Sequence, residues 1–302
     1  MSITWQGVFP AVTTQFHSNG ALDLPGTARH IEALIAAGVQ GLVMLGSLGE
    51  NTAHEPHEKL AVMEMALGVT GGRVPVLSGV AECTTALACR YAGECRRLGA
   101  DGLMLLPGMV YRSDPRETVT HFRTVARSVD LPILCYNNPI AYGVDITPEM
   151  FMELARERNL EAIKESSGDT RRFTDLFNTV GERYALFAGV DDLIMECTLL
   201  GAVGWIAGAG LALPAENQHL WNLMMAGRWD EARAVYRWMM PVLHLDVGPK
   251  FIQKIKLAVQ EAGLGAEWVR APRLPLEGAE RAATIGAIQK ALGSKPALAA
   301  EV

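Results

Sequence analysis

The sequence predicts an α/β fold, a (β/α)8 TIM barrel with a C-terminal helical extension. Apolar runs alternate with helical patterns about every 25–35 residues, and this repeats eight times. The runs are nearly continuous in apolar character, as expected for parallel strands that are covered on both faces. The predicted strands are Val8–Phe16, Gly41–Gly46, Val74–Gly79, Gly102–Leu106, Pro132–Tyr136, Ala162–Glu165, Leu186–Gly189 and Gly204–Ala207.

Amphipathic stretches lie between these strands, and only helical patterns follow Pro214. The stretches between strands include Ala28–Ala37, Thr85–Leu98, Arg116–Ser128, Pro148–Arg158 and Arg172–Val180. The later ones are Ala215–Met225, Trp229–Met240, Lys250–Glu261 and Leu276–Leu292. We therefore expect a barrel over residues 1–214 and a helical region over residues 215–302 that packs on the barrel.

The composition excludes several classes of function. Hydrophobic residues make up 49% of the 302 residues, which supplies a large core, and the net charge of −6 offers no surface for nucleic acid. No run reaches the roughly 18 apolar residues of a membrane span, and the start lacks a secretory signal. Five cysteines without a CxxC pair and histidines without ligand spacing indicate a cytoplasmic protein with no metal and no cofactor.

Lys164 is the most informative single residue. It ends an apolar strand pattern, and it is the only lysine between Lys59 and Lys250. Burial of an ammonium group is costly unless its pKa falls, and a buried lysine with a lowered pKa can attack a carbonyl carbon to form a Schiff base. The alternative is a structural lysine paired with Glu165 or Asp169. The segment alone leaves both roles open.

Other polar residues fall at the same end of other strands. Gly46–Asn51 follows the second strand, where Ser47 and backbone N–H groups could hold a carboxylate, although a plain turn would look similar. Tyr136 ends the fifth strand, and Gly189 ends the seventh. A buried tyrosine with a satisfied hydroxyl is the structural alternative for Tyr136. Because the carboxyl ends of barrel strands converge on one mouth, the shared position favours the Schiff-base role of Lys164.

Five segments together resemble the dihydrodipicolinate synthase / N-acetylneuraminate lyase family of class I aldolase-like barrels. They are Ala11–Phe16, Gly46–Glu50, Tyr136–Pro139, Ile163–Asp169 and Gly189–Asp192. The resemblance implies a lyase in which Lys164 forms the Schiff base, Tyr136 is the acid/base and Ser47 relays protons. It also implies that Leu48 and Gly49 cradle the substrate carboxylate, that Ile206 and Gly189 line the pocket, and that Tyr111 reaches into a neighbouring subunit. The expected assembly is a homotetramer.

Two departures from the family pattern concern the substrate. Synthase members carry an arginine two residues after the YNxP proline, where this sequence has Ala141, and Leu48 replaces a threonine of the second-strand loop. Both changes remove contacts to a charged second substrate. The whole sequence, especially Gly7–Thr14, Asn138, His244–Asp246 and Arg270–Pro275, resembles 1-pyrroline-4-hydroxy-2-carboxylate deaminases of hydroxyproline catabolism. That activity, which releases 2,5-dioxopentanoate and ammonia, is our expectation.

Two other functions remain open from the sequence. One is a pyruvate-dependent aldolase or synthase such as 4-hydroxy-tetrahydrodipicolinate synthase. The other is a catalytically silent binding protein on the same fold, which the combination of Lys164, Tyr136 and Ser47 argues against because binding needs no nucleophile.

Overall fold

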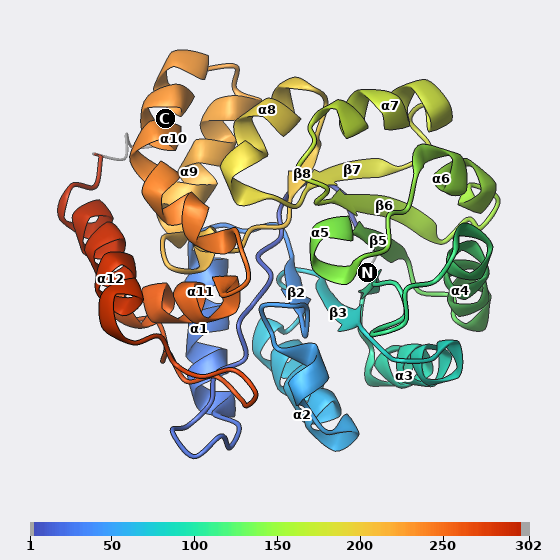
Figure 1. The fold of residues 1–302 in the computed structure, drawn as a ribbon, viewed down its shortest axis with the longest axis horizontal. Coiled ribbons are helices and arrows are strands. Elements are labelled where there is room, and N and C mark those ends of the chain that lie inside the picture. Colours follow the sequence, from blue (N-terminus) through green and yellow to red (C-terminus); the bar gives the residue numbers. More distant parts are fainter. Residues whose placement is uncertain (1–2, 297–302) are drawn as a thin grey trace.

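Eight parallel strands form one curved sheet in the computed structural model, which describes residues 3–296 (Figure 1). Their order in the sheet is β1-β8-β7-β6-β5-β4-β3-β2. The strands are β1 Gly7–Val8, β2 Leu42–Met44, β3 Val76–Val80, β4 Gly102–Leu105, β5 Ile133–Asn137, β6 Leu160–Glu165, β7 Ala185–Ala188 and β8 Gly204–Trp205.

The two edges of the sheet meet just beyond β1. The Val12 N–H donates to the Val43 carbonyl at 2.9 Å, and the Val43 N–H donates to the Pro10 carbonyl at 2.9 Å. These bonds join β1 to β2, so the predicted barrel is confirmed. The first strand is shorter than the predicted Val8–Phe16, because Pro10 has no N–H to continue a regular ladder.

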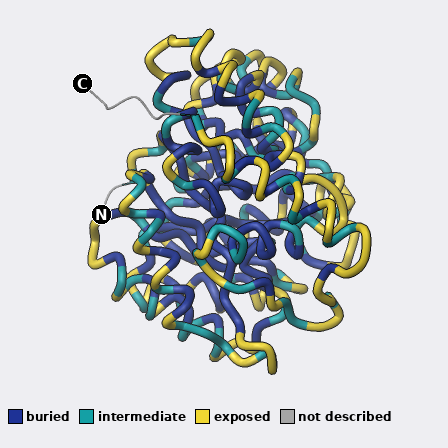
Figure 2. The backbone as a smooth tube through the Cα atoms, turned by 90° about the vertical axis from the view of Figure 1, so that its left-hand side faces the viewer, coloured by how far each residue is buried: buried dark blue, intermediate teal, exposed yellow. Residues whose placement is uncertain are grey.

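Helices cover the outside of the sheet (Figure 1). They are α1 Leu24–Ala36, α2 Pro56–Thr70, α3 Thr85–Leu98, α4 Pro115–Ser128, α6 Pro148–Leu154, α7 Arg171–Val180 and α8 Ile194–Leu199. The short helix α5 Pro139–Tyr142 instead lies at the carboxyl ends of the strands (Figure 1). The sequence pattern did not identify α2, whose apolar residues are spread around the helix, but a capping box between Glu55 and Glu58 marks its start. Buried backbone fills the interior and exposed backbone lies on the outer turns (Figure 2).

Beyond β8 the described chain is helical. It contains α9 Pro214–Met225, α10 Trp229–Leu243, α11 Phe251–Glu261 and α12 Gly278–Gly293. Helix α9 packs against α1 and β1, and α12 packs against α10 and α11. The boundary at residue 214 stays a prediction. No helix within residues 3–296 is long and apolar enough to cross a membrane.

A buried ion pair attaches these later helices to the loop after β2. Lys256 of α11 places Nζ 2.9 Å from Glu50 Oε1, and both side chains are fully buried. The backbone N–H of Arg270 donates to the other Glu50 oxygen at 3.0 Å. The loop that carries Ser47 is therefore held from the C-terminal side.

Candidate active site

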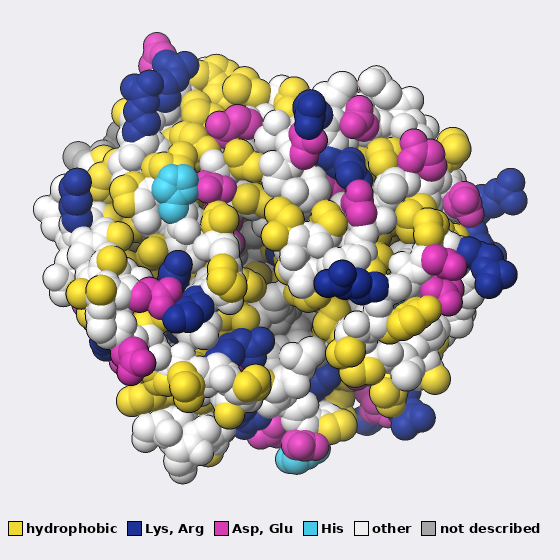
Figure 3. Space-filling view, viewed as in Figure 1, with side chains coloured by type: hydrophobic (Ala, Val, Ile, Leu, Met, Phe, Trp, Pro, Cys, Tyr) yellow, Lys and Arg dark blue, Asp and Glu magenta, His cyan; other side chains and the backbone are white. Residues whose placement is uncertain are grey.

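A cavity of about 640 Å³ lies at the carboxyl ends of the strands. The space-filling view shows a hollow near the middle of this face (Figure 3). Its walls come from the ends of the strands and from the segment between α10 and α11. The polar side chains that line it belong to Ser47, Tyr136, Asn138, Lys164, Ser166, Asp192 and Asp246.

Lys164 and Tyr136 lie side by side in this wall. They are register partners on β6 and β5, and Lys164 Nζ lies 4.0 Å from the centre of the Tyr136 ring. Burial lowers the pKa of Lys164, while negative charge on Asp246, Tyr142 and Asp191 opposes that shift. A lowered pKa increases the fraction of neutral amine, which is the form that attacks a carbonyl.

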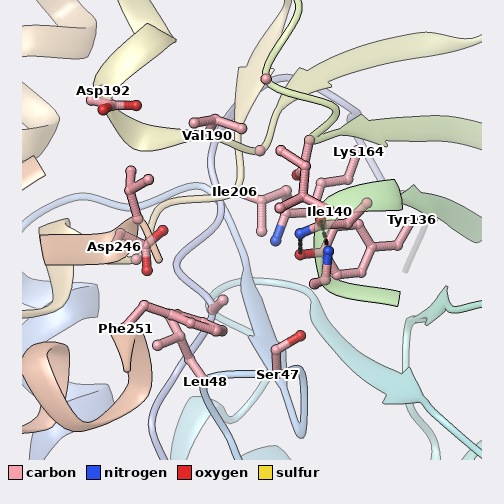
Figure 4. A pocket seen from close by; sticks show the side chains of 18 of the residues that line it. Ser47, Leu48, Tyr136, Ile140, Lys164, Val190, Asp192, Ile206, Asp246 and Phe251 are labelled. Carbon is pink, nitrogen blue, oxygen red and sulfur yellow. Dashed lines mark hydrogen bonds between the residues drawn. The ribbon is translucent and has the colours of Figure 1, made fainter. Parts of the chain in front are cut away.

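The carboxylates suggested as structural partners of Lys164 are engaged elsewhere. Glu165 accepts hydrogen bonds from Asn137 Nδ2 at 3.0 Å and from the Ser167 N–H at 2.6 Å. Asp169 forms an exposed ion pair with Arg171. Neither arrangement restrains the lysine, so its amine faces the cavity (Figure 4).

The Tyr136 hydroxyl is also placed for chemistry. Asn138 Nδ2 donates to it at 3.0 Å. Burial is the main reason that the pKa of Tyr136 rises, so the phenol is protonated at neutral pH and can act as an acid. Its hydroxyl has a partner, as in the structural interpretation, yet Tyr136 also lines the cavity.

Gly189 gives the lysine its space. A Cβ atom at this position would lie 2.0 Å from Ser166 Oγ and 2.7 Å from Lys164 Cγ. Any larger residue would therefore displace the Lys164 side chain. Leu48 and Ile206 contribute the apolar surface that the sequence predicted for this pocket.

Ser47 lines the cavity from the loop after β2, on the side away from Lys164 in Figure 4. Within residues 3–296 no acceptor is found for the backbone N–H groups of Ser47, Leu48 and Gly49. Successive free N–H groups form a site for an anion. Gly49 itself does not line the cavity: a Cβ there would meet the Leu45 and Val12 backbones, so its glycine serves close packing.

Tyr111 lies outside the cavity of its own chain. Its side chain is 64% exposed, and its hydroxyl donates to Glu117 at 3.1 Å. A contact with a neighbouring subunit, as the family resemblance implies, stays a prediction.

Two aspartates near Lys164, Asp191 buried and Asp246 half-buried, were not predicted as site residues. Asp191 accepts hydrogen bonds from Trp205 Nε1 at 2.8 Å and from the Gly208 and Ala209 N–H groups, and burial raises its pKa to about 6. Asp246 lines the cavity, and its Oδ1 has no partner within the described residues. Burial, followed by the charge on Asp191, raises the pKa of Asp246 well above its usual range. The segment His244–Asp246 stood out in the sequence, but no spacing rule tied it to the barrel mouth.

Known proteins resemble the whole described chain. The dihydrodipicolinate synthetase family model matches residues 4–291. A 4-hydroxy-tetrahydrodipicolinate synthase of Exiguobacterium sibiricum is 38% identical over 90% of this chain and 92% of its own length. Among solved structures, a putative dihydrodipicolinate synthetase from Pseudomonas aeruginosa is 30% identical with a TM-score of 0.90, covering 95% of this chain and 99% of its own. The E. coli prophage protein YagE, solved with pyruvate, is 28% identical with a TM-score of 0.90, covering 96% and 99%.

Proposed function

Because the chain belongs to the dihydrodipicolinate synthetase family, we propose that it is a Schiff-base lyase whose Lys164 attacks a small 2-keto or cyclic imino acid. The observation that carries this proposal is the buried Lys164 amine, which lines the cavity beside Tyr136 and has no carboxylate within salt-bridge distance among the described residues. Lysine amines in apolar surroundings are the nucleophiles of Schiff-base enzymes.

Substrate binding follows from the two sides of the cavity. The free N–H groups of Ser47 and Leu48, which both line the cavity, would hold the carboxylate next to the reacting carbon. Lys164 would then add to that carbon, and Tyr136 and Ser47 would carry protons to and from the adduct.

The rest of the cavity favours a substrate with one carboxylate. Lys164 is the only lysine or arginine that lines it in the described part of the chain, and Ala141 stands where a synthase arginine would. The opposite wall carries Asp192 and Asp246. A second substrate carboxylate would find no cationic partner there among the described residues, whereas a hydroxyl or an amine would find hydrogen-bond partners.

We therefore propose 1-pyrroline-4-hydroxy-2-carboxylate as substrate. Lys164 Nζ bonds to C2 and the ring C2–N bond breaks, which leaves the amine on C5. C3 then loses a proton, and the C4 hydroxyl leaves as water with a proton from Asp246, whose pKa burial raises. After tautomerisation, one water hydrolyses the C5 imine and a second water hydrolyses the C2 imine. The products are 2,5-dioxopentanoate, ammonia and free Lys164, with one water consumed overall.

The second candidate is a pyruvate-dependent synthase or aldolase. It is supported by the names of the relatives, which are 4-hydroxy-tetrahydrodipicolinate synthases, and by the pyruvate complex of YagE. In this reaction Lys164 would form an imine with pyruvate, and the resulting enamine would attack an aldehyde.

Borohydride reduction separates the candidates. The protein is incubated with pyruvate or with pyrroline-4-hydroxy-2-carboxylate, reduced, and weighed by intact mass; ammonia release is followed in parallel without borohydride. We expect an adduct on Lys164 and ammonia from the pyrroline compound. An adduct with pyruvate, condensation with an aldehyde and no ammonia would establish the synthase instead. No adduct from either compound would overturn the Schiff-base proposal.

A further inference from the structure

A second tyrosine belongs to the site although the sequence did not single it out. Tyr142 ends the short helix α5, and its hydroxyl is hydrogen-bonded to Ser47 Oγ. Its ring stands edge-on to the Tyr136 ring, with the ring centroids 5.8 Å apart. The Ser47 hydroxyl is therefore held by a tyrosine of the same chain.

Asn138 fixes both tyrosines at once. Its Nδ2 donates to the Tyr136 hydroxyl at 3.0 Å, and its Oδ1 accepts from the Ala141 N–H at 2.9 Å, which caps α5. The Asn138 carbonyl also accepts from the Tyr142 N–H at 3.0 Å. Because one residue positions the two phenols, their spacing is set by a single short segment.

Tyr142 lies on the far side of Ser47 from the main cavity. It lines a second cavity of about 180 Å³, together with Arg273. Ser47, Ala141 and Phe251 line both cavities, so Ser47 stands at their junction. Protons that leave the reacting atoms through Ser47 would reach this second cavity by way of Tyr142.

We infer that Tyr142 is the positioning residue of the Ser47 proton path and that it takes, within one chain, the place that a neighbouring subunit's tyrosine was expected to fill. This inference rests on the proposed Schiff-base function. When Ser47 gives its proton to the substrate, Tyr142 gives its own to Ser47, and the sequence reverses in the return step, so no proton is gained or lost. Burial raises the pKa of Tyr142, and positive charge on Lys164 and Arg273 opposes that rise, so Tyr142 holds its proton until Ser47 needs one. In contrast, the Tyr111 hydroxyl is engaged with Glu117 on the surface.

The test is the Tyr142→Phe variant, with turnover and trapping measured separately. We expect kcat to fall about 100-fold, the size of effect that a lost proton-transfer group produces, while KM stays within about twofold. Borohydride should still trap substrate on Lys164, since the amine and its pocket are intact. Combining the change with Ser47→Ala should add little further loss, because both act on one path.

Two further tyrosine variants make the result interpretable. Tyr184→Phe removes a buried hydroxyl that donates to the Phe151 carbonyl and lines neither cavity, and it should leave kcat unchanged. Tyr111→Phe tests the competing route through a neighbouring subunit. A kcat loss in Tyr111→Phe as large as in Tyr142→Phe, a normal kcat in Tyr142→Phe, or loss of trapping in Tyr142→Phe would each overturn the inference. Absence of trapping in the wild-type protein would instead contradict the proposed Schiff-base function.

Discussion

The two walls of the cavity differ in origin and in charge. One wall consists of adjacent strands, β5 and β6, and presents Lys164 and Tyr136. The other comes from the segment between α10 and α11, which presents Asp246 and, at the start of α11, Phe251 (Figure 4). The strand wall carries groups suited to Schiff-base chemistry. The helical wall carries the acid that would select the substrate. In the proposed reaction, Schiff-base formation and substrate selection therefore belong to separate segments of the chain.

The sharpest test of the strand wall is removal of its amine. Lys164→Ala should abolish turnover and borohydride trapping, because no other lysine lines the cavity within the described residues. Lys164→Arg keeps the charge without the nucleophile and should be equally inactive. Circular dichroism should show that both variants stay folded. Residual turnover above about 1% of wild type would show that the Lys164 amine is not the nucleophile.

The ion pair that attaches the helical wall should contribute to the free energy of unfolding. Lys256→Met breaks the buried pair with Glu50 and leaves that carboxylate without its lysine, which we expect to cost about 3–5 kcal/mol in urea unfolding. Lys250→Met, which breaks an exposed pair with Glu280, is the matched control and should cost less than about 1 kcal/mol. Equal effects in the two variants would mean that the wall is held by other contacts.

Asp246 decides whether the helical wall selects the substrate. Asp246→Asn should lower kcat/KM for the hydroxylated pyrroline substrate about 100-fold, since the amide cannot protonate a leaving hydroxyl. Trapping of pyruvate should persist, because the strand wall is unchanged. An equal loss with both compounds would assign Asp246 to the chemistry common to the family.

The smallest effect we expect is a shift in the pH at which the trapping rate rises. Because burial lowers the pKa of Lys164, the trapping rate should rise with pH through a value below 10.5, as the neutral amine forms. The charge of Asp246 opposes that lowering, so Asp246→Asn should move the rise to lower pH. Trapping rates between about pH 5 and 10 measure the displacement. A shift to higher pH would contradict the electrostatic effect of Asp246 on Lys164.

The local sequence pattern pointed to Lys164 and Tyr136 of the strand wall but not to Asp246 of the helical wall. Lys164 and Tyr136 each end an apolar run, and barrel geometry alone brings such ends together. Tyr142 was missed because its partner Ser47 is 95 positions away and their contact depends on the turn that Asn138 caps. Asp246 was missed as a site residue because no periodicity shows where a loop between helices will fold back. The shape of such a loop depends on tertiary contacts, which local pattern does not encode.

The Glu50 contacts join the loop after β2 to α11 and to the segment that follows it. One oxygen of the Glu50 carboxylate pairs with Lys256, and the other accepts a hydrogen bond from the Arg270 N–H. Ser47 lies three residues earlier in the same loop. An engineer who replaces the helical segment with that of a relative, in order to change the substrate, must keep the contacts of Lys256 and Arg270 with Glu50. A graft that omits them would loosen the carboxylate cradle and lose reactivity along with the old specificity.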